Sequence, residues 1–208
     1  MKNIIYRDLK KEDLKEITML IKDAFKFHEF IHNKELLDII STIYLEEALY
    51  KSSFVKVASK DNKVLGIILC SANNSLTNYH HLLSLKKEKD FSMLPIKDKR
   101  DKNELTEFIK VKDIYDELIN GKESLFDGSI ELFIVSKEAR GLGIGKTLLR
   151  LALKYMKSMD VSSIYLFTDT RCNYGFYDSQ GFNCLNEKSL YIKTIDSTLQ
   201  TFLYEYML

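Results

Sequence analysis

Apolar side chains recur along this chain at two spacings, and the spacing predicts the secondary structure. Near the N-terminus they return every three or four residues, from Leu14 through His28 and from Lys34 to Tyr50, which predicts two helices. Three shorter runs with strand character are Asn3 to Asp8, Phe54 to Ala58 and Val64 to Ala72. The last two flank an Asp-Asn-Lys turn and predict a hairpin.

The pattern resumes after Gly128 in a different order. Ile130 to Val135 predicts a strand, Thr147 to Met159 a helix and Ser163 to Phe167 another strand. The remaining predictions are a short helix from Asn173 to Gln180 and two strands, Phe182 to Ile192 and Leu199 to Met207. Together these elements predict an α/β fold of three layers (an α+β arrangement), in which helices flank a mixed central sheet of about seven strands.

The stretch between the two patterns has a different character. It carries mixed charge runs, Lys86 to Asp90 and Lys97 to Lys102, around the only proline of the chain, which favours a solvated loop. Helical spacing returns from Glu104 to Ile119. We therefore expect one domain over residues 1–208, with an insertion at about 73–128.

Composition narrows the class of protein. The 208 residues include 31 Lys and Arg against 30 Asp and Glu, a net charge of +1, so no general basic surface for nucleic acid is expected. The apolar run Val64 to Cys70 is far too short to span a membrane, and the N-terminal apolar stretch stops at Arg7, too early for a signal peptide. Three cysteines without a CxxC pair predict no disulfide framework and a cytoplasmic location.

A glycine-rich turn is the first candidate for chemistry. Gly141, Gly143 and Gly145 stand at alternate positions where a helix is predicted to begin. Such a turn leaves backbone amides uncovered at the positive end of a helix dipole, which suits an anion such as phosphate. Arg140 and Lys146 add positive charge to it. A plain tight turn is the alternative.

The same residues resemble a family motif. The run Arg140-Gly141-Leu142-Gly143-Ile144-Gly145 is similar to the acyl-CoA motif of the GNAT superfamily of N-acetyltransferases, and Val135 precedes it at the family's spacing. A later family signature appears as Tyr177-Asp178-Ser179-Gln180-Gly181-Phe182. The resemblance implies a mostly antiparallel sheet that splays between its fourth and fifth strands.

The resemblance also implies a site and a reaction. Acetyl-CoA would lie with its pyrophosphate on the glycine turn and its pantetheine arm along the preceding strand, and no metal is expected. The implied cofactor-binding residues are Phe133, Ile134, Val135, Arg140, Gly141, Leu142, Gly143, Ile144, Gly145, Lys146, Asn173 and Tyr177. Glu131 would serve as the base and Tyr177 as the acid when a primary amine attacks directly. Cys172 would then be a packed residue, not a nucleophile.

The acceptor is a small-molecule or peptide amine in this interpretation, and the protein a monomer or homodimer. The insertion should emerge at the Glu131 end and cover the acceptor site, with Tyr79, His80 and His81 as candidates. A CoA-binding module without catalysis is one alternative. His28-Glu29-Phe30-Ile31-His32 is a literal HExxH and allows another, a zinc hydrolase, if both histidines share a helix face. His28 could also be a rim residue of the fold or of the acceptor pocket.

Overall fold

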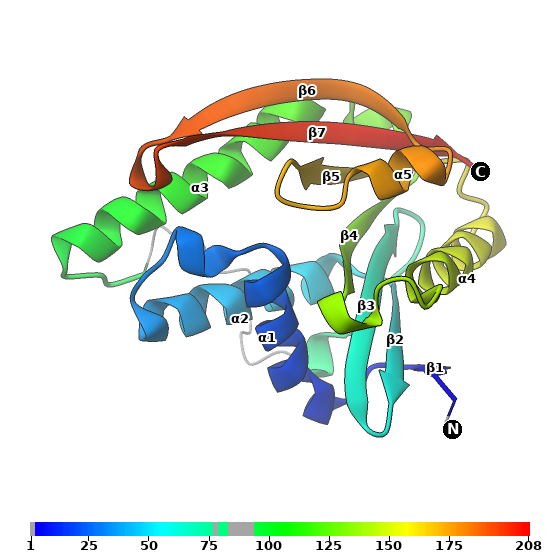
Figure 1. The fold of residues 1–208 in the computed structure, drawn as a ribbon. Coiled ribbons are helices and arrows are strands. Elements are labelled where there is room, and N and C mark those ends of the chain that lie inside the picture. The colour runs from blue at the N-terminus through cyan, green and yellow to red at the C-terminus, as the bar shows by residue number, and fades with distance from the viewer. Residues whose placement is uncertain (1–2, 77–78, 83–93) are drawn as a thin grey trace.

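The computed structural model describes residues 3–76, 79–82 and 94–208. Its centre is a seven-stranded sheet with the strand order β1-β2-β3-β4-β5-β7-β6 (Figure 1). The strands are β1 (Ile5–Arg7), β2 (Phe54–Lys60), β3 (Lys63–Ala72), β4 (Gly128–Val135), β5 (Ser163–Asp169), β6 (Asn183–Ile192) and β7 (Ser197–Met207). The predicted α/β class and strand number are confirmed.

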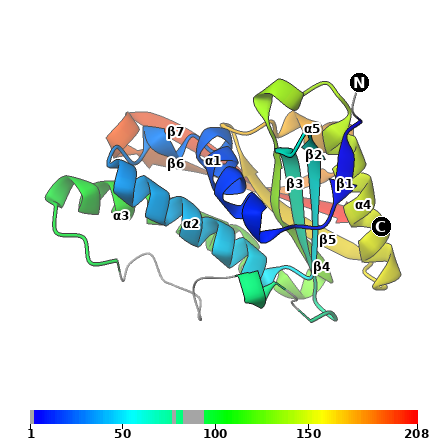
Figure 2. The same ribbon diagram turned by 90° about the horizontal axis from the view of Figure 1, so that it is seen from below.

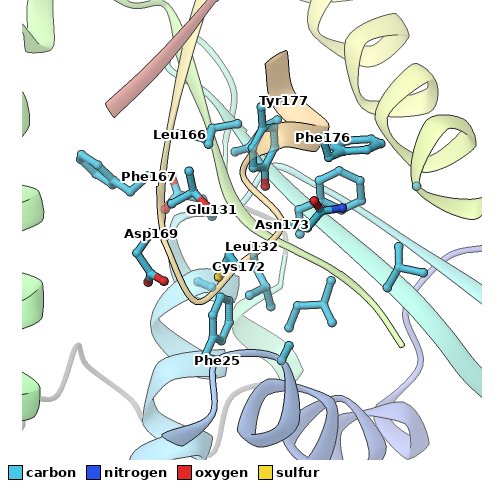
Figure 3. A pocket seen from close by; sticks show the side chains of 18 of the residues that line it. Phe25, Glu131, Leu132, Leu166, Phe167, Asp169, Cys172, Asn173, Phe176 and Tyr177 are labelled. Atoms are coloured by element: carbon cyan, nitrogen blue, oxygen red, sulfur yellow. The ribbon is translucent and has the colours of Figure 1, made fainter. Parts of the chain in front are cut away.

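The sheet is antiparallel except at one pair, β4 and β5, which run parallel. These two strands are in register only at Gly128 with Ile164 and at Ser129 with Tyr165. Beyond Ser129 they diverge, which Figure 3 shows from close by. The predicted splay between the fourth and fifth strands is therefore confirmed, and it opens a gap in the middle of the sheet.

Helices cover both faces of the sheet. The helices α1 (Leu14–Ala24) and α2 (Lys34–Lys51) lie on one side and α4 (Ile144–Ser158) on the other (Figure 2). Helix α4 buries one stripe of apolar side chains, Ile144, Leu148, Leu149, Ala152 and Met156. Burial of such a stripe on one face is the principal stabilisation of an amphipathic helix.

Two further helices complete the fold. The helix α3 (Lys99–Ile119) belongs to the predicted insertion and runs along the β6–β7 hairpin, while α5 (Gly175–Ser179) is a short helix after β5 (Figure 1). Asp98 caps α3, because its side chain accepts hydrogen bonds from the backbone N–H groups of Arg100 and Asp101.

A β-bulge interrupts β4 at the position of the splay. Leu132 pairs with Leu69 and Ile130 with Cys70, so Glu131 is an extra residue on β4. The bulge also reverses the side-chain alternation. Leu132 packs in the core under α1 and α2, whereas Ile130, two residues earlier, packs in the core under α4. Glu131 thus lies where the strand changes register.

Two local predictions were wrong. The first helix ends at Ala24 and does not reach His28, because Lys26 adopts a left-handed conformation (φ 52°) and a separate 3-10 turn, η2 (Phe27–Glu29), follows. The charge run from Lys97 to Lys102 is not all loop, since α3 begins within it. The run from Lys86 to Asp90 lies outside the described residues.

No helix in the described part of the chain has both the length and the apolar character needed to cross a bilayer. All three cysteines are free thiols, with Cys70 buried and Cys184 exposed.

Candidate functional site

A cavity of about 630 Å³ fills the gap between β4 and β5. Its walls come from α1 and α2, from α3, from both diverging strands and from the loop between β4 and α4. Figure 3 shows side chains from these elements pointing into one space, with Glu131 and Tyr177 both reaching into it. The volume is typical of small-molecule sites.

The glycine turn forms one end of this cavity. Gly141 and Gly143 have positive φ angles of 81° and 76°, which only glycine adopts without strain, and Gly143 is the N-cap of α4. The turn therefore presents backbone amides at a helix N-terminus, an arrangement that binds anions. Exposed Arg140 and Lys146 line the same end. Leu142 is 60% exposed and lies outside the cavity wall.

The backbone of β4 supplies the middle of the cavity. The Ser136 N–H donates to the Leu65 carbonyl on β3, at 2.8 Å. Hydrogen-bonded pairs alternate along an antiparallel ladder, so Ile134 also points its N–H and C=O at β3. The backbone groups of Phe133 and Val135 then point the other way, into the gap, where β5 does not pair with them. An extended ligand with amide groups can pair with such an edge.

Glu131 lies further along the same strand, away from the glycine turn. Its carboxylate accepts a hydrogen bond from the Ser129 hydroxyl, and the side chain is half-buried. The bulge places this carboxylate in the cavity wall, since the extra residue turns β4 just where it leaves β5. A base here is within the cavity and still open to solvent.

Tyr177 enters the cavity from α5. Its ring packs against Phe133, Phe176, Phe182 and Tyr204, with centroid distances of 5.6 to 6.4 Å. Burial raises the pKa of its phenol above the ordinary value, and the nearby Cys172 adds to this effect. The hydroxyl therefore keeps its proton through the neutral pH range.

Cys172 is next to this tyrosine in the cavity wall. Burial raises the pKa of its thiol to about 12, with the charge of Asp169 as the next cause. A thiol with such a pKa is a poor nucleophile at neutral pH.

Most of the residues predicted for the site line this cavity. They are Glu131, Phe133, Ile134, Val135, Arg140, Gly141, Gly143, Ile144, Gly145, Lys146, Asn173 and Tyr177, and only Leu142 is missing. The roles assigned to them remain predictions. Sequence reasoning missed a group at the end opposite the glycine turn: Phe25, Tyr44, Glu47, Tyr115, Asp116, Tyr165 and Asp169. These residues come from separate elements, and only the carboxylate at the end of a strand, Asp169, was a signal in the sequence.

The HExxH residues have other partners. His28 lies in η2, and His32 lies beyond it in a loop, so they do not share a helix face. The Nδ1 atom of His32 is 2.9 Å from Glu104, and Glu29 pairs with Arg171 at 3.0 Å. No group of three or more metal-ligating side chains occurs among the residues that the structure describes. The spacing that suggested zinc is therefore not realised.

Two candidates from the insertion, Tyr79 and His81, do not line the cavity. The Tyr79 hydroxyl accepts a hydrogen bond from the Val55 N–H, at 3.1 Å, and the side chain packs beside the core. His81 is exposed and outside the cavity wall. The side chain of His80 lies outside what the structure describes.

Comparison with known proteins identifies relatives. The model of the acetyltransferase (GNAT) family matches residues 16–182, most of the chain. No curated protein matches the sequence. Among solved structures, a ribosomal-protein-alanine N-acetyltransferase from Brucella melitensis is similar with a TM-score of 0.57 and 16% identity, covering 98% of this chain and 99% of that one. An N-acetyltransferase from Staphylococcus aureus Mu50 has a TM-score of 0.56 and 15% identity, covering 99% and 98%.

Proposed function

We propose that this chain, which belongs to the GNAT family of acetyltransferases and is an acyltransferase, transfers an acetyl group from acetyl-CoA to a primary amine. One observation carries the proposal. A single cavity contains a glycine turn suited to an anion, then a free strand edge, then a carboxylate. This is the order in which the pyrophosphate, the pantetheine arm and the thioester follow one another in acetyl-CoA. The family uses acetyl-CoA, and the cavity's features suit each part of that molecule.

The cofactor residues follow from these features. The amides of Gly141 and Gly143, with Arg140 and Lys146 beside them, would hold the pyrophosphate. The backbone groups of Phe133 and Val135 would pair with the amides of the pantetheine arm. From Glu131 to Val135 the strand spans roughly 13 Å, which is of the right order to run from the pyrophosphate to the thioester.

The chemistry is the aminolysis of a thioester. Glu131, directly or through a water, takes a proton from the ammonium group of the acceptor. The neutral amine nitrogen then forms a bond to the acetyl carbon, while a backbone N–H at the free edge of β4 stabilises the developing oxyanion. The carbon–sulfur bond breaks, the Tyr177 hydroxyl gives its proton to the leaving sulfur, and the second proton of the acetylated nitrogen returns through water to the Tyr177 phenolate as the amide forms. Cys172 forms no bond in this scheme, as its raised pKa favours.

The test is thiol release from acetyl-CoA by the purified full chain, with and without a primary amine. We expect amine-dependent release, and a loss of about 10²-fold or more in kcat for Glu131→Gln, the usual minimum for removal of a general base. The matched control is Glu187→Gln, because Glu187 is exposed on β6 and outside the cavity wall. Calorimetry should find CoA bound equally by all three proteins. Binding of CoA without amine-dependent release would refute acetyl transfer and favour a module that only binds CoA.

A further inference from the structure

The helix α3 connects the two walls of the cavity at the end opposite the glycine turn. On one side it contacts η2, the following loop and α2. Phe108 packs edge-on against Phe27 at 4.9 Å, and Glu104 accepts hydrogen bonds from the backbone and ring of His32, at 3.0 and 2.9 Å. Lys112 pairs with a carboxylate of α2, at 2.6 Å.

On its other side the same helix contacts β5 and the β6–β7 hairpin. Tyr115 stacks on Phe167 with 4.9 Å between ring centroids, and its hydroxyl donates to Asp169 at 3.1 Å. Glu107 accepts from the Lys193 N–H at 3.2 Å, just after β6. Figure 1 shows α3 running along the hairpin. A helix fixed to both walls restricts the room for an extended peptide at this end, as far as the described residues go.

The side chains that α3 adds to the cavity determine its polarity. Lys112, Tyr115, Asp116 and Ile119 line it, beside Phe25, Tyr44 and Tyr165 from other elements. The charged groups at this end are the carboxylates of Glu47, Asp116, Glu131 and Asp169 and the ammonium groups of Lys51 and Lys112. Acidic groups therefore outnumber basic ones, with aromatic rings between them.

Some of these carboxylates already have partners. Lys112 forms an ion pair with Glu47, and Asp169 accepts hydrogen bonds from the Tyr115 hydroxyl and from the Arg171 N–H, at 2.7 Å. Asp116 is exposed at the cavity mouth, and Glu131 faces the reacting centre. The charges of both also help to raise the pKa of Tyr165, after burial, to about 12, so both act on the same part of the cavity.

From this enclosure and charge we propose that the acceptor is a small linear amine with a second cationic group, not the N-terminus of a protein. The inference rests on the proposed acetyl transfer and names its substrate class. Glu131 receives the reacting amine, and Asp116 on α3 is the specificity-determining residue for the distant cation. The aromatic side chains between them accommodate the alkyl part and attract the cation.

Three probes of similar length test the charge. They are putrescine, butylamine and γ-aminobutyrate, with a far end that is positive, neutral and negative, and a short peptide with a free alanine N-terminus tests the size. We expect kcat/KM to be highest for putrescine, about 5-fold above butylamine, the effect of one solvent-exposed ion pair. The values for γ-aminobutyrate and the peptide should be lower than that for butylamine.

The variant Asp116→Asn should abolish the preference for putrescine over butylamine, chiefly by raising the KM for putrescine. The matched control is Asp113→Asn, since Asp113 is exposed on the same helix and does not line the cavity. The control should retain the preference. The inference is overturned if the peptide or γ-aminobutyrate is used as well as putrescine, or if Asp116→Asn keeps the preference. In those cases acetyl transfer itself stands. Absence of thiol release with every amine would instead refute the proposed function, and this inference with it.

Discussion

The substitution Tyr177→Phe separates catalysis from packing at the candidate site. The ring of Tyr177 is held by Phe133, Phe176, Phe182 and Tyr204, and phenylalanine keeps all four contacts. No hydrogen bond joins the hydroxyl to any residue that the structure describes, and the side chain is half-buried. Only the proton donor is therefore removed.

The two expected magnitudes differ widely. Because no internal hydrogen bond is broken and no cavity is created, the free energy of unfolding should change by less than about 0.5 kcal/mol. A general acid contributes about 10²- to 10⁴-fold to a rate, so kcat should fall by about 10²-fold or more. That corresponds to at least about 2.7 kcal/mol of transition-state stabilisation, several times the structural effect.

The assay measures kcat at saturating acetyl-CoA and amine, with urea unfolding and CoA calorimetry on the same preparations. Tyr174→Phe is the matched control, since Tyr174 directly precedes α5, packs on Phe202 and does not line the cavity. It should keep kcat. If Tyr177→Phe keeps kcat within about 3-fold, or loses CoA affinity in proportion to rate, the hydroxyl is not the acid.

The pH profile gives an independent check on the same residue. Burial raises the pKa of Tyr177 above its ordinary value of about 10, so the acid form persists to higher pH than for a free tyrosine. Activity should therefore rise with pH as the amine is deprotonated and show no decline from Tyr177 below about pH 10. A descending limb near neutral pH that disappears in Tyr177→Phe would contradict this assignment.

Three further experiments test separate parts of the structure. In Gly143→Ala the new Cβ meets no atom within 4 Å, but the residue must adopt φ near 76°. The substitution should therefore lower the free energy of unfolding by about 1 kcal/mol in urea and also weaken CoA binding. Unchanged CoA affinity would contradict the role of the glycine turn. A double-mutant cycle of Arg171→Met and Glu29→Gln should give a coupling of about 1 kcal/mol in urea unfolding, since the ion pair is partly buried. A coupling near zero would refute a stabilising role for this ion pair. Cys172→Ala should keep kcat within about 3-fold, because a thiol with a pKa of about 12 is no nucleophile at neutral pH; loss of all activity would argue for covalent catalysis.

The parts of the site that are local in sequence could be predicted from it. The positive φ angles at Gly141 and Gly143 need glycine, and the sequence has glycine there. The apolar stripe of α4 and the strand before the turn follow from periodicity alone. In each case the physical requirement falls on residues within a few positions of one another, so the sequence carries it directly.

The wrong predictions involve contacts between distant residues. Apolar spacing continued through His28, and no glycine or proline marked the end of the first helix at Ala24. The following turn contacts a residue distant in sequence, since Glu29 pairs with Arg171 from the loop after β5. The first turn of α3 was equally hidden, although the helix from Glu104 to Ile119 was predicted, because its charged start is typical of a loop until the cap at Asp98 is recognised.

The sequence singles out Glu131 as a candidate base, but it does not show that a β-bulge places this residue in the cavity wall. Read with a period of two, Ile130, Leu132 and Ile134 should share one face of β4, yet Ile130 packs in the opposite core from the other two. A bulge is visible only in the register with a partner strand, and here it appears between Leu69 and Cys70 of β3. The place where simple alternation fails is also where β4 leaves β5 and the cavity begins. Local rules are expected to fail at functional sites, since a regular strand at this point would pair with its neighbour and close the cavity.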